Sequence, residues 1–224
     1  MPDSLWDLRN LQHIALEGCE KLGMLPDYLG NLTNLRHPDL NMCKSLRVLP
    51  DSMEKLTKLE FINLDSCKNL EKLPNSLLEF PNIHCTQAIR YDDHDGIHIN
   101  LSSFPCLKMV PDSLKYMRSL ASISLTGCES LKSLPVFLGE LTYLVNINLG
   151  YCKSLEMLPD SLENLKDLHH INLSGCESLK RLPDSLGKLK SLHLINLGHC
   201  KSLEMLSDSL ENLKDLHYIN HQWM

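Results

Sequence analysis

The cysteines are the residues of this chain whose type and spacing could support the widest range of chemistry. The chain has nine, and thiols can form disulfides, bind zinc or act as nucleophiles. Seven occupy one position of a repeated phrase: Cys19, Cys43, Cys67, Cys128, Cys152, Cys176 and Cys200. Seven equivalent residues cannot all pair with one another, and neither C-x₂-C nor C-x₂-H occurs. We therefore predict a reduced, buried ladder of cysteines, with no disulfide framework, metal site or cofactor.

The eleven histidines could act in acid–base catalysis, because an imidazole titrates near neutral pH. Most of them follow the repeat, as at His169, His193 and His217, and do not converge on one site. The patterns G-x-x-x-x-G-K-[ST] and G-x-S-x-G are also absent from the sequence. We predict that the chain is not an enzyme, and keep an enzyme as the third alternative for its function.

One stretch interrupts the repeat and gathers further polar residues. Pro74 and Pro111 are separated by 37 positions, whereas the ordinary repeat is 24 residues long, and the extra material lies near residues 86–98. We predict a solvated surface loop here, which is the second candidate for a functional surface because loops often carry function. Its candidate site residues are Asp92, Asp93, His94 and Asp95. A metal site would use Asp93, His94, Asp95 and His98, with His84 and Cys85 as further ligands. The spacing of these residues matches no known ligand pattern.

The repeated unit itself predicts the elements that position all these residues. In LPDSLENLKDLHHINLSGCESLKR, which starts at Leu158, the alternation of Ile171 and Leu173 with polar residues predicts a short strand. The leucines of PDSLGKLKSL at 183–192 are three apart, which suits a 3₁₀ turn with Pro183 in its first turn. Asp184 and Ser185 are expected to accept hydrogen bonds from the free N–H groups there. Stacked units would form a parallel sheet on one side and turns on the other.

This phrase is identified as a leucine-rich repeat, and it resembles the intracellular plant type. The recurring INL-x-x-C-x-S-L-x-x-LPDSL unit is similar to the repeat region of disease-resistance receptors that carry a TIR domain and a nucleotide-binding domain. The resemblance implies a cytoplasmic protein-recognition module with a sensing and autoinhibitory role. The alternative is an intracellular leucine-rich-repeat scaffold, or a substrate adaptor of a ubiquitin ligase, outside immunity.

We expect one α/β solenoid, right-handed and curved like a horseshoe, with strands on the concave face and 3₁₀ or short helical turns on the convex face. About nine repeats would span residues 1–224, with both ends cut within a repeat and open to self-association. Pro38 stands where other repeats have a strand Ile, so we predict poor strand pairing there. The units at 147–170 and 195–218 differ only at Tyr151/His199, Pro159/Ser207 and His170/Tyr218, which indicates a duplicated block.

The concave strand surface is the main candidate for binding a partner. Its outward side chains are predicted from the strand register as His13, Glu17, His37, Asp39, Asn41, Phe61, Asn63, Asp65, His98, Asn100, Asn146, Asn148, His170, Asn172, Leu194, Asn196 and Tyr218. Three carboxylates make its N-terminal end acidic, which favours a protein partner with a basic surface. We expect the column of asparagines to bond along the sheet. With a net charge of −6 and no long apolar run, neither nucleic acid nor a membrane is an expected partner.

Overall fold

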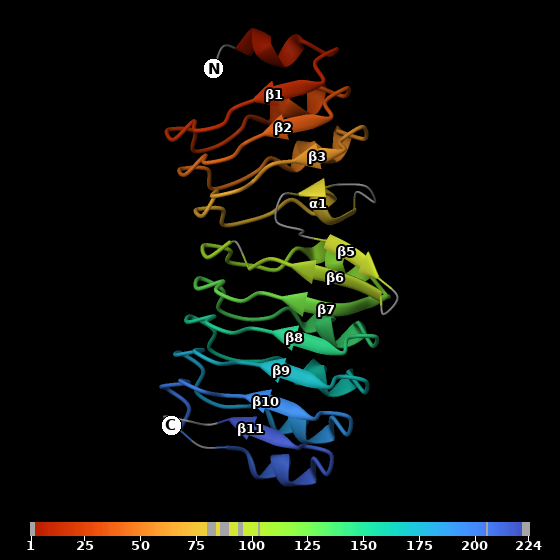
Figure 1. Cartoon of the computed structure of the whole chain (residues 1–224), viewed down its shortest axis with the longest axis vertical. Coiled ribbons are helices and arrows are strands. Elements are labelled where there is room, and N and C mark those ends of the chain that lie inside the picture. The colour runs from red at the N-terminus through yellow and green to blue at the C-terminus, as the bar shows by residue number, and fades with distance from the viewer. Residues whose placement is uncertain are drawn as a thin grey trace. The chain divides into compact units, whose positions relative to one another are not determined.

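The computed structural model describes residues 3–79, 84–85, 90–93, 96–102, 104–204 and 206–220. The chain divides into two compact units. Unit 1 comprises Met1–Arg90 and Pro111–Leu114, and unit 2 comprises Tyr91–Val110 and Lys115–Met224. In each unit, short strands lie side by side and 3₁₀ helices follow them along the opposite side of the coils (Figure 1).

From β6 onwards, the sheet of unit 2 is built from one short strand per repeat. Its order is β11-β10-β9-β8-β7-β6-β5, and every pair from β6 to β11 is parallel. Ile147, Ile171, Ile195 and Ile219 lie opposite one another, as a repeat of constant length requires. The strands are β5 (Arg90–Asp93), β6 (Gly96–Asn100), β7 (Leu120–Ser124), β8 (Asn146–Asn148), β9 (His170–Asn172), β10 (Leu194–Asn196) and β11 (Tyr218–Asn220).

Most Leu-Pro segments lead into a five-residue 3₁₀ helix, whereas Leu73-Pro74 leads into a four-residue α-helix. In the repeat that contains Pro183, the N–H of Leu186 donates to the Pro183 carbonyl at 3.1 Å and closes the first turn. The helices in unit 1 are η1 (Asp3–Asp7), η2 (Asp27–Asn31) and η3 (Asp51–Lys55). Unit 2 has η5 (Val136–Glu140), η6 (Asp160–Asn164), η7 (Asp184–Lys188) and η8 (Asp208–Asn212), and η4 (Asp112–Tyr116) begins in unit 1.

The predicted capping of these helices is wrong. Pro183 lies just before η7, and no side chain caps that helix. The Ser185 hydroxyl instead donates to Asp160 of the preceding repeat at 3.3 Å. A capping contact forms at η8, where Ser207 replaces the usual proline and its hydroxyl accepts from the Ser209 N–H. In a solenoid the neighbouring coil is as close as the helix's own first turn, and it provides the partner.

The core of each coil is made of leucine, isoleucine and cysteine. In one coil of unit 2, Leu165, Leu168, Ile171, Leu173 and Cys176 are each at most 1% exposed. The cysteine ladder is confirmed at six of its seven positions, which are buried and free, whereas Cys19 is half-buried. Phe104 fills the ladder position in the irregular repeat, is 1% exposed, and donates its N–H to Leu101 O as the cysteines do to their leucines.

The strands of unit 1 form two separate pairs. Strands β1 (His13–Ala15) and β2 (His37–Asp39) form one pair, and β3 (Phe61–Ile62) and β4 (His84–Cys85) form the other. Between β2 and the coil of β3 the ladder is reduced to an isolated bridge, Asp39 to Asn63. Pro38 accepts a hydrogen bond from the Asn63 N–H at 3.1 Å but has no N–H of its own to donate. The predicted weak pairing at Pro38 is therefore confirmed. A short helix, α1 (Ser76–Glu79), follows in this unit.

The inserted stretch is only partly the surface loop that the sequence predicts. Residues 90–93 form β5, and 96–100 form β6, so strands extend into it. Gly96 has φ +128, and a Cβ there would lie 2.9 Å from the Ser119 carbonyl oxygen. Glycine therefore permits the close approach in which Ile97 N donates to Ser119 O at 3.0 Å. Asp92 and Asp93 belong to β5, while His94, Asp95 and residues 86–89 lie outside the described residues.

Candidate protein-interaction surface

The outward side chains of the strands, with the turn residues that follow them, are called the strand face below. In unit 1 this surface carries carboxylates from three successive coils. The Asn41 amide donates to Glu17 at 3.2 Å, and its backbone N–H donates to Asp39 at 3.0 Å. The N–H of Asp65 donates to the Asn63 side chain at 3.1 Å. The carboxylates of Glu17 and Asp39 are therefore linked through Asn41, whereas at Asp65 the backbone N–H makes the bond.

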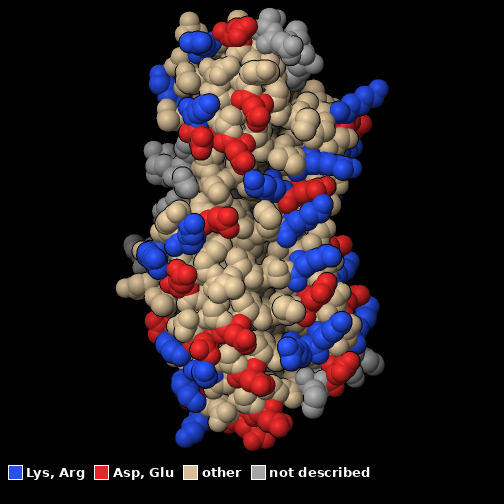
Figure 2. All heavy atoms as spheres, turned by 180° about the vertical axis from the view of Figure 1, so that it is seen from behind, with Lys and Arg blue, Asp and Glu red and all other residues tan. Residues whose placement is uncertain are grey.

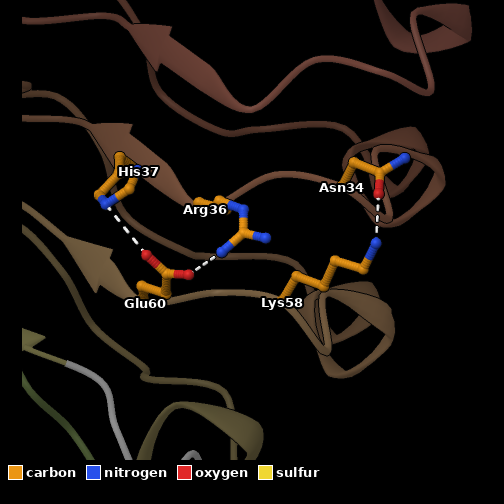
Figure 3. Close-up of polar contacts among 5 residues, drawn as sticks. All are labelled: Asn34, Arg36, His37, Lys58 and Glu60. Carbon is orange, nitrogen blue, oxygen red and sulfur yellow. Dashed lines mark hydrogen bonds and ion pairs between the residues drawn. The ribbon is translucent and has the colours of Figure 1, made fainter.

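A second polar cluster adjoins this group (Figure 3). Glu60 precedes β3 and pairs with Arg36 through one carboxylate oxygen, while its other oxygen lies 3.4 Å from His37 Nε2. The His37 ring stacks on His13 of β1 with centroids 4.6 Å apart and planes 3° apart. Close by, Lys58 Nζ donates to the Asn34 side chain at 2.7 Å. The strand register places the two histidines on this surface. It does not predict the pair of Arg36 and Glu60, because each lies one position before its strand and the two are 24 residues apart in the sequence.

In unit 2 the strand face is an ordered array of amides and hydroxyls. Asn172 donates to Asn148 Oδ1 at 3.0 Å, and each of these amides accepts the backbone N–H two residues later, from Ser174 and Gly150. Asn196 accepts the Gly198 N–H in the same way at 3.1 Å. The expected bonding along the asparagine column is thus confirmed between Asn148 and Asn172. In the earlier coils, His98 Nδ1 lies 2.9 Å from the Ser122 hydroxyl, and Asn100 accepts the Ser102 N–H.

In seven repeats, the turn after the strand holds a residue with positive φ. Four of them carry a Cβ, and they are Met42, Ser66, Tyr151 and His199, with φ between 57° and 62°. Gly18, Gly127 and Gly175 take this position in other repeats. The left-handed region is unfavourable for residues with a side chain. These turns border the strand face, and Tyr151 and Met42 are 54% and 40% exposed.

Lysine and glutamate alternate between neighbouring coils on another part of the surface. Lys44 pairs with Glu20, Lys153 with Glu129, and Lys201 with Glu177, at N–O distances of 2.7–2.9 Å. The hydrogen bond from Lys201 lowers the pKa of Glu177. Figure 2 shows blue and red side chains interleaved along one margin of the face opposite to the view in Figure 1. Surface ion pairs of this kind each contribute little stability. A wrong register between neighbouring coils would, however, place like charges next to one another.

The helix side of unit 2 contains an open groove of about 800 Å³. Its lining includes Met157 and the first-turn aspartates Asp160, Asp184 and Asp208. Two of these aspartates accept serine hydroxyls of the next coil, Asp160 from Ser185 and Asp184 from Ser207 at 2.6 Å. These bonds link consecutive coils.

The described residues offer little nucleophilic or metal chemistry. Burial raises the pKa of the Cys152 thiol to about 12 and also raises the pKa values of Cys128 and Cys176, so these thiols are neutral near pH 7. Within the described part of the chain, no group of three or more His, Cys, Asp or Glu residues is arranged to hold a metal ion. None of the helices described is long and apolar enough to cross a membrane.

The structure places the remaining predicted surface residues on the strands as expected from their register. Asn146, His170, Leu194 and Tyr218 lie opposite one another at the first position of β8 to β11. Phe61 begins β3 and is half-buried. Of the two aromatic residues in the predicted set, Tyr218 is the more exposed, at 52%. The strand register thus identified these positions, although it did not identify the turn residue Tyr151 as an exposed aromatic.

No family model matches the chain, and no curated protein matches it. Among solved structures, the leucine-rich repeat domain of the type III effector XCV3220 (XopL) is similar, with a TM-score of 0.54 and 19% identity over 93% of this chain and 74% of that one. The chain has the leucine-rich-repeat fold.

Two further leucine-rich-repeat neighbours have lower scores. The plant peptide hormone receptor RGFR1, in complex with RGF2, has a TM-score of 0.33 and 17% identity, covering 96% of this chain and 48% of that one. A leucine-rich-repeat protein of Leptospira interrogans, LIC12759, has a TM-score of 0.29 and 19% identity, covering 98% and 80%. The fold is therefore assigned from the XopL domain and the chain's own strands, and the function has to be argued from the chain's own residues.

Proposed function

We propose that the chain is a non-catalytic module that recognises a partner protein through its strand face. The observation that supports this most is the fixed set of polar side chains there. In unit 1, Glu17 and Asp39 are held by bonds from Asn41, and in unit 2 the Asn172 amide donates to Asn148 along the sheet. Side chains that are already ordered lose little entropy when a partner binds. A preorganised, largely polar surface is suited to specific protein recognition.

The partner that fits unit 1 carries a basic surface. Glu17, Asp39 and Asp65 present carboxylates from successive coils, and the nearby Arg36 is already paired with Glu60. Complementary charge of this kind acts mainly on the association rate and on the choice of partner.

We infer a plant disease-resistance-like role from the resemblance of the repeats. The chain would be the sensing and autoinhibitory region of a receptor whose nucleotide switch lies in another part, because the P-loop pattern is absent here. Free cysteines throughout the ladder suit a reducing cytoplasm. A scaffold or ubiquitin-ligase adaptor outside immunity is the alternative, and the identity of the partner would separate the two.

The test is capture of partners from plant-cell extract with wild type and a neutralised variant, Glu17→Gln with Asp39→Asn and Asp65→Asn. These substitutions keep the side-chain oxygens that accept the bonds described above and remove only the charge. We expect a partner identified with wild type to associate with the variant about tenfold more slowly at low salt, and this difference to shrink as salt is raised.

The matched control removes three exposed carboxylates from the 3₁₀ helices of unit 1, through Asp7→Asn, Asp27→Asn and Glu54→Gln. This control changes the net charge by the same amount as the neutralised variant, and it should associate with the partner at the wild-type rate. If both variants slow association to the same degree, net charge alone is responsible and the strand face of unit 1 is not the site. If the neutralised variant binds like wild type, the proposed acidic contact is wrong.

A further inference from the structure

The duplicated block of unit 2 has diverged at exposed positions. Residues 147–170 and 195–218 differ at three pairs. Tyr151 and His199 occupy the turn after the strand and are exposed, and His170 and Tyr218 are the exposed first residues of β9 and β11. Every buried residue of the block is the same in both copies. Two of the three changes therefore alter side chains along the strand face and leave the core unchanged.

Tyr151 is held in an unfavourable backbone conformation. Its φ is +59, whereas the neighbouring repeats use Gly127 and Gly175 at the same position, with φ +75 and +72. Glycine adopts this region without cost, and a tyrosine does not. Local strain of this kind is retained where a side chain has a function.

The ring of Tyr151 is also fixed in place. A Cβ built on Gly175 of the next coil would lie 2.7 Å from Tyr151 Cδ1, so the ring lies directly against that glycine. The side chain is nevertheless 54% exposed. One part of the residue is held by the scaffold, and the rest remains available to a partner. Rigid, partly exposed tyrosines are favoured as energetic hot spots of protein interfaces.

On the side of the strands, the surface next to Tyr151 is polar but uncharged. Asn148, Gly150 and Asn172 form the bonded amide array described above, and a Cβ on Gly150 would approach Asn172 Nδ2 to 3.1 Å. The outward positions of β7 to β11 contain no Asp, Glu, Lys or Arg. A charged partner group would lose water here without gaining an opposite charge. Amides, which both donate and accept, match the hydrogen-bonding groups of a peptide backbone.

We propose that the strand face of unit 2 binds an uncharged peptide segment of a partner protein, with Tyr151 as its anchor, and that the divergent pairs Tyr151/His199 and His170/Tyr218 determine which segment is bound. This inference rests on the proposed function. It adds a second recognition surface, which differs chemically from the acidic strand face of unit 1. Unit 1 would select for positive charge, and unit 2 would select for uncharged groups that can cover an aromatic ring.

The experiment uses the full chain and a phage-displayed library of random peptides as the probe. Peptides selected on wild type are synthesised, and their dissociation constants are measured for wild type and Tyr151→Gly. We expect selected peptides that are uncharged in their shared motif and bind Tyr151→Gly at least tenfold more weakly. The variant should remain folded, with a thermal midpoint close to that of wild type, because glycine relieves the left-handed conformation at this turn.

The control is Ser66→Gly, which makes the same backbone change at the equivalent turn of unit 1. It should leave peptide affinity unchanged. A double exchange, Tyr151→His with His199→Tyr, should select a different peptide motif. Selected peptides that are strongly charged, or that bind Tyr151→Gly as tightly as wild type, would overturn this inference and leave the acidic site of unit 1 unaffected. If no peptide is selected and no protein is captured from extract, both this inference and the proposed function fail.

Discussion

At the scale of the residue, the ladder cysteine packs the core and bonds to the backbone of the preceding coil. Cys152 donates its thiol hydrogen to Leu125 O at 3.1 Å, while its backbone N–H donates to Leu149 O at the same distance. Cys176 repeats the arrangement with Leu149, and Cys200 repeats it with Leu173. A small, polarisable side chain with one weak donor fits this position. The role is structural, which is why so many cysteines occur without a disulfide among those described.

Because of the buried thiols, the free energy of unfolding should depend on pH in the alkaline range. Burial raises the pKa of Cys152 to about 12, whereas an unfolded thiol titrates near 8.5. Above about pH 8.5 the unfolded chain releases this proton and the folded chain keeps it, so the free energy of unfolding falls as pH rises towards the folded pKa. Each such thiol should add about 1.4 kcal/mol per pH unit to this decline.

Urea unfolding of wild type and Cys152→Ser, measured under reducing conditions from about one pH unit below to about two pH units above the unfolded thiol pKa, checks this prediction. The variant should show a shallower decline above pH 9 by about the contribution of one thiol. Cys19→Ser, at the half-buried ladder position, is the control and should keep a slope closer to that of wild type. Equal slopes for wild type and Cys152→Ser would show that this thiol does not titrate differently on unfolding.

At the scale of the element, the two strand pairs of unit 1 meet at Pro38. The strand residue has its carbonyl bonded to Asn63 but lacks the N–H that an isoleucine would offer to the following coil. Pro38 is buried and lies opposite Ile14, where unit 2 places isoleucine throughout β8 to β11. Pro38 therefore occupies a buried strand position that other coils fill with isoleucine.

Pro38→Ile should stabilise the protein by about 1 kcal/mol, the usual net contribution of one hydrogen bond. The midpoint of chemical denaturation should rise, and amide exchange should slow in β2 and β3. Pro50→Ala, at the residue before η3 and outside the strands, is the control for removing a proline and should not slow exchange in those strands. An unchanged or lower midpoint for Pro38→Ile would mean that another feature separates the two strand pairs.

The elements that depend on the 24-residue period could be predicted from the sequence, and those that depend on contacts between coils could not. Strand positions such as Ile171, and the buried cysteines, follow directly from periodicity. The serine–aspartate bond of Ser185 was missed because its partner lies 25 residues away. The pairing of Arg36 with Glu60 was missed for the same reason. Tyr151 was recorded as a difference between repeats, but its exposure depends on the ring resting on Gly175.

At the scale of the whole molecule, the question is whether the two compact units unfold as one array. The chain passes from unit 1 into unit 2 after Arg90, returns to unit 1 for Pro111–Leu114, and then continues in unit 2. We propose that about nine repeats form a single array. In such a protein each repeat is stabilised by its neighbours, so a defect in one part lowers the stability of the rest.

Trp6 allows this proposal to be tested, because it lies in unit 1, is 2% exposed, and is one of only two tryptophans. In a Trp223→Phe background, Leu168→Ala removes a fully buried side chain of unit 2, at a local cost of about 2–5 kcal/mol. For a single array, the urea midpoints of Trp6 fluorescence and of far-UV circular dichroism should fall together. Leu32→Ala, in unit 1, provides the control, because it must lower the Trp6 midpoint in either case. A Trp6 midpoint that stays at the parent value for Leu168→Ala, while the circular dichroism transition shifts or splits, would mean that the units unfold independently.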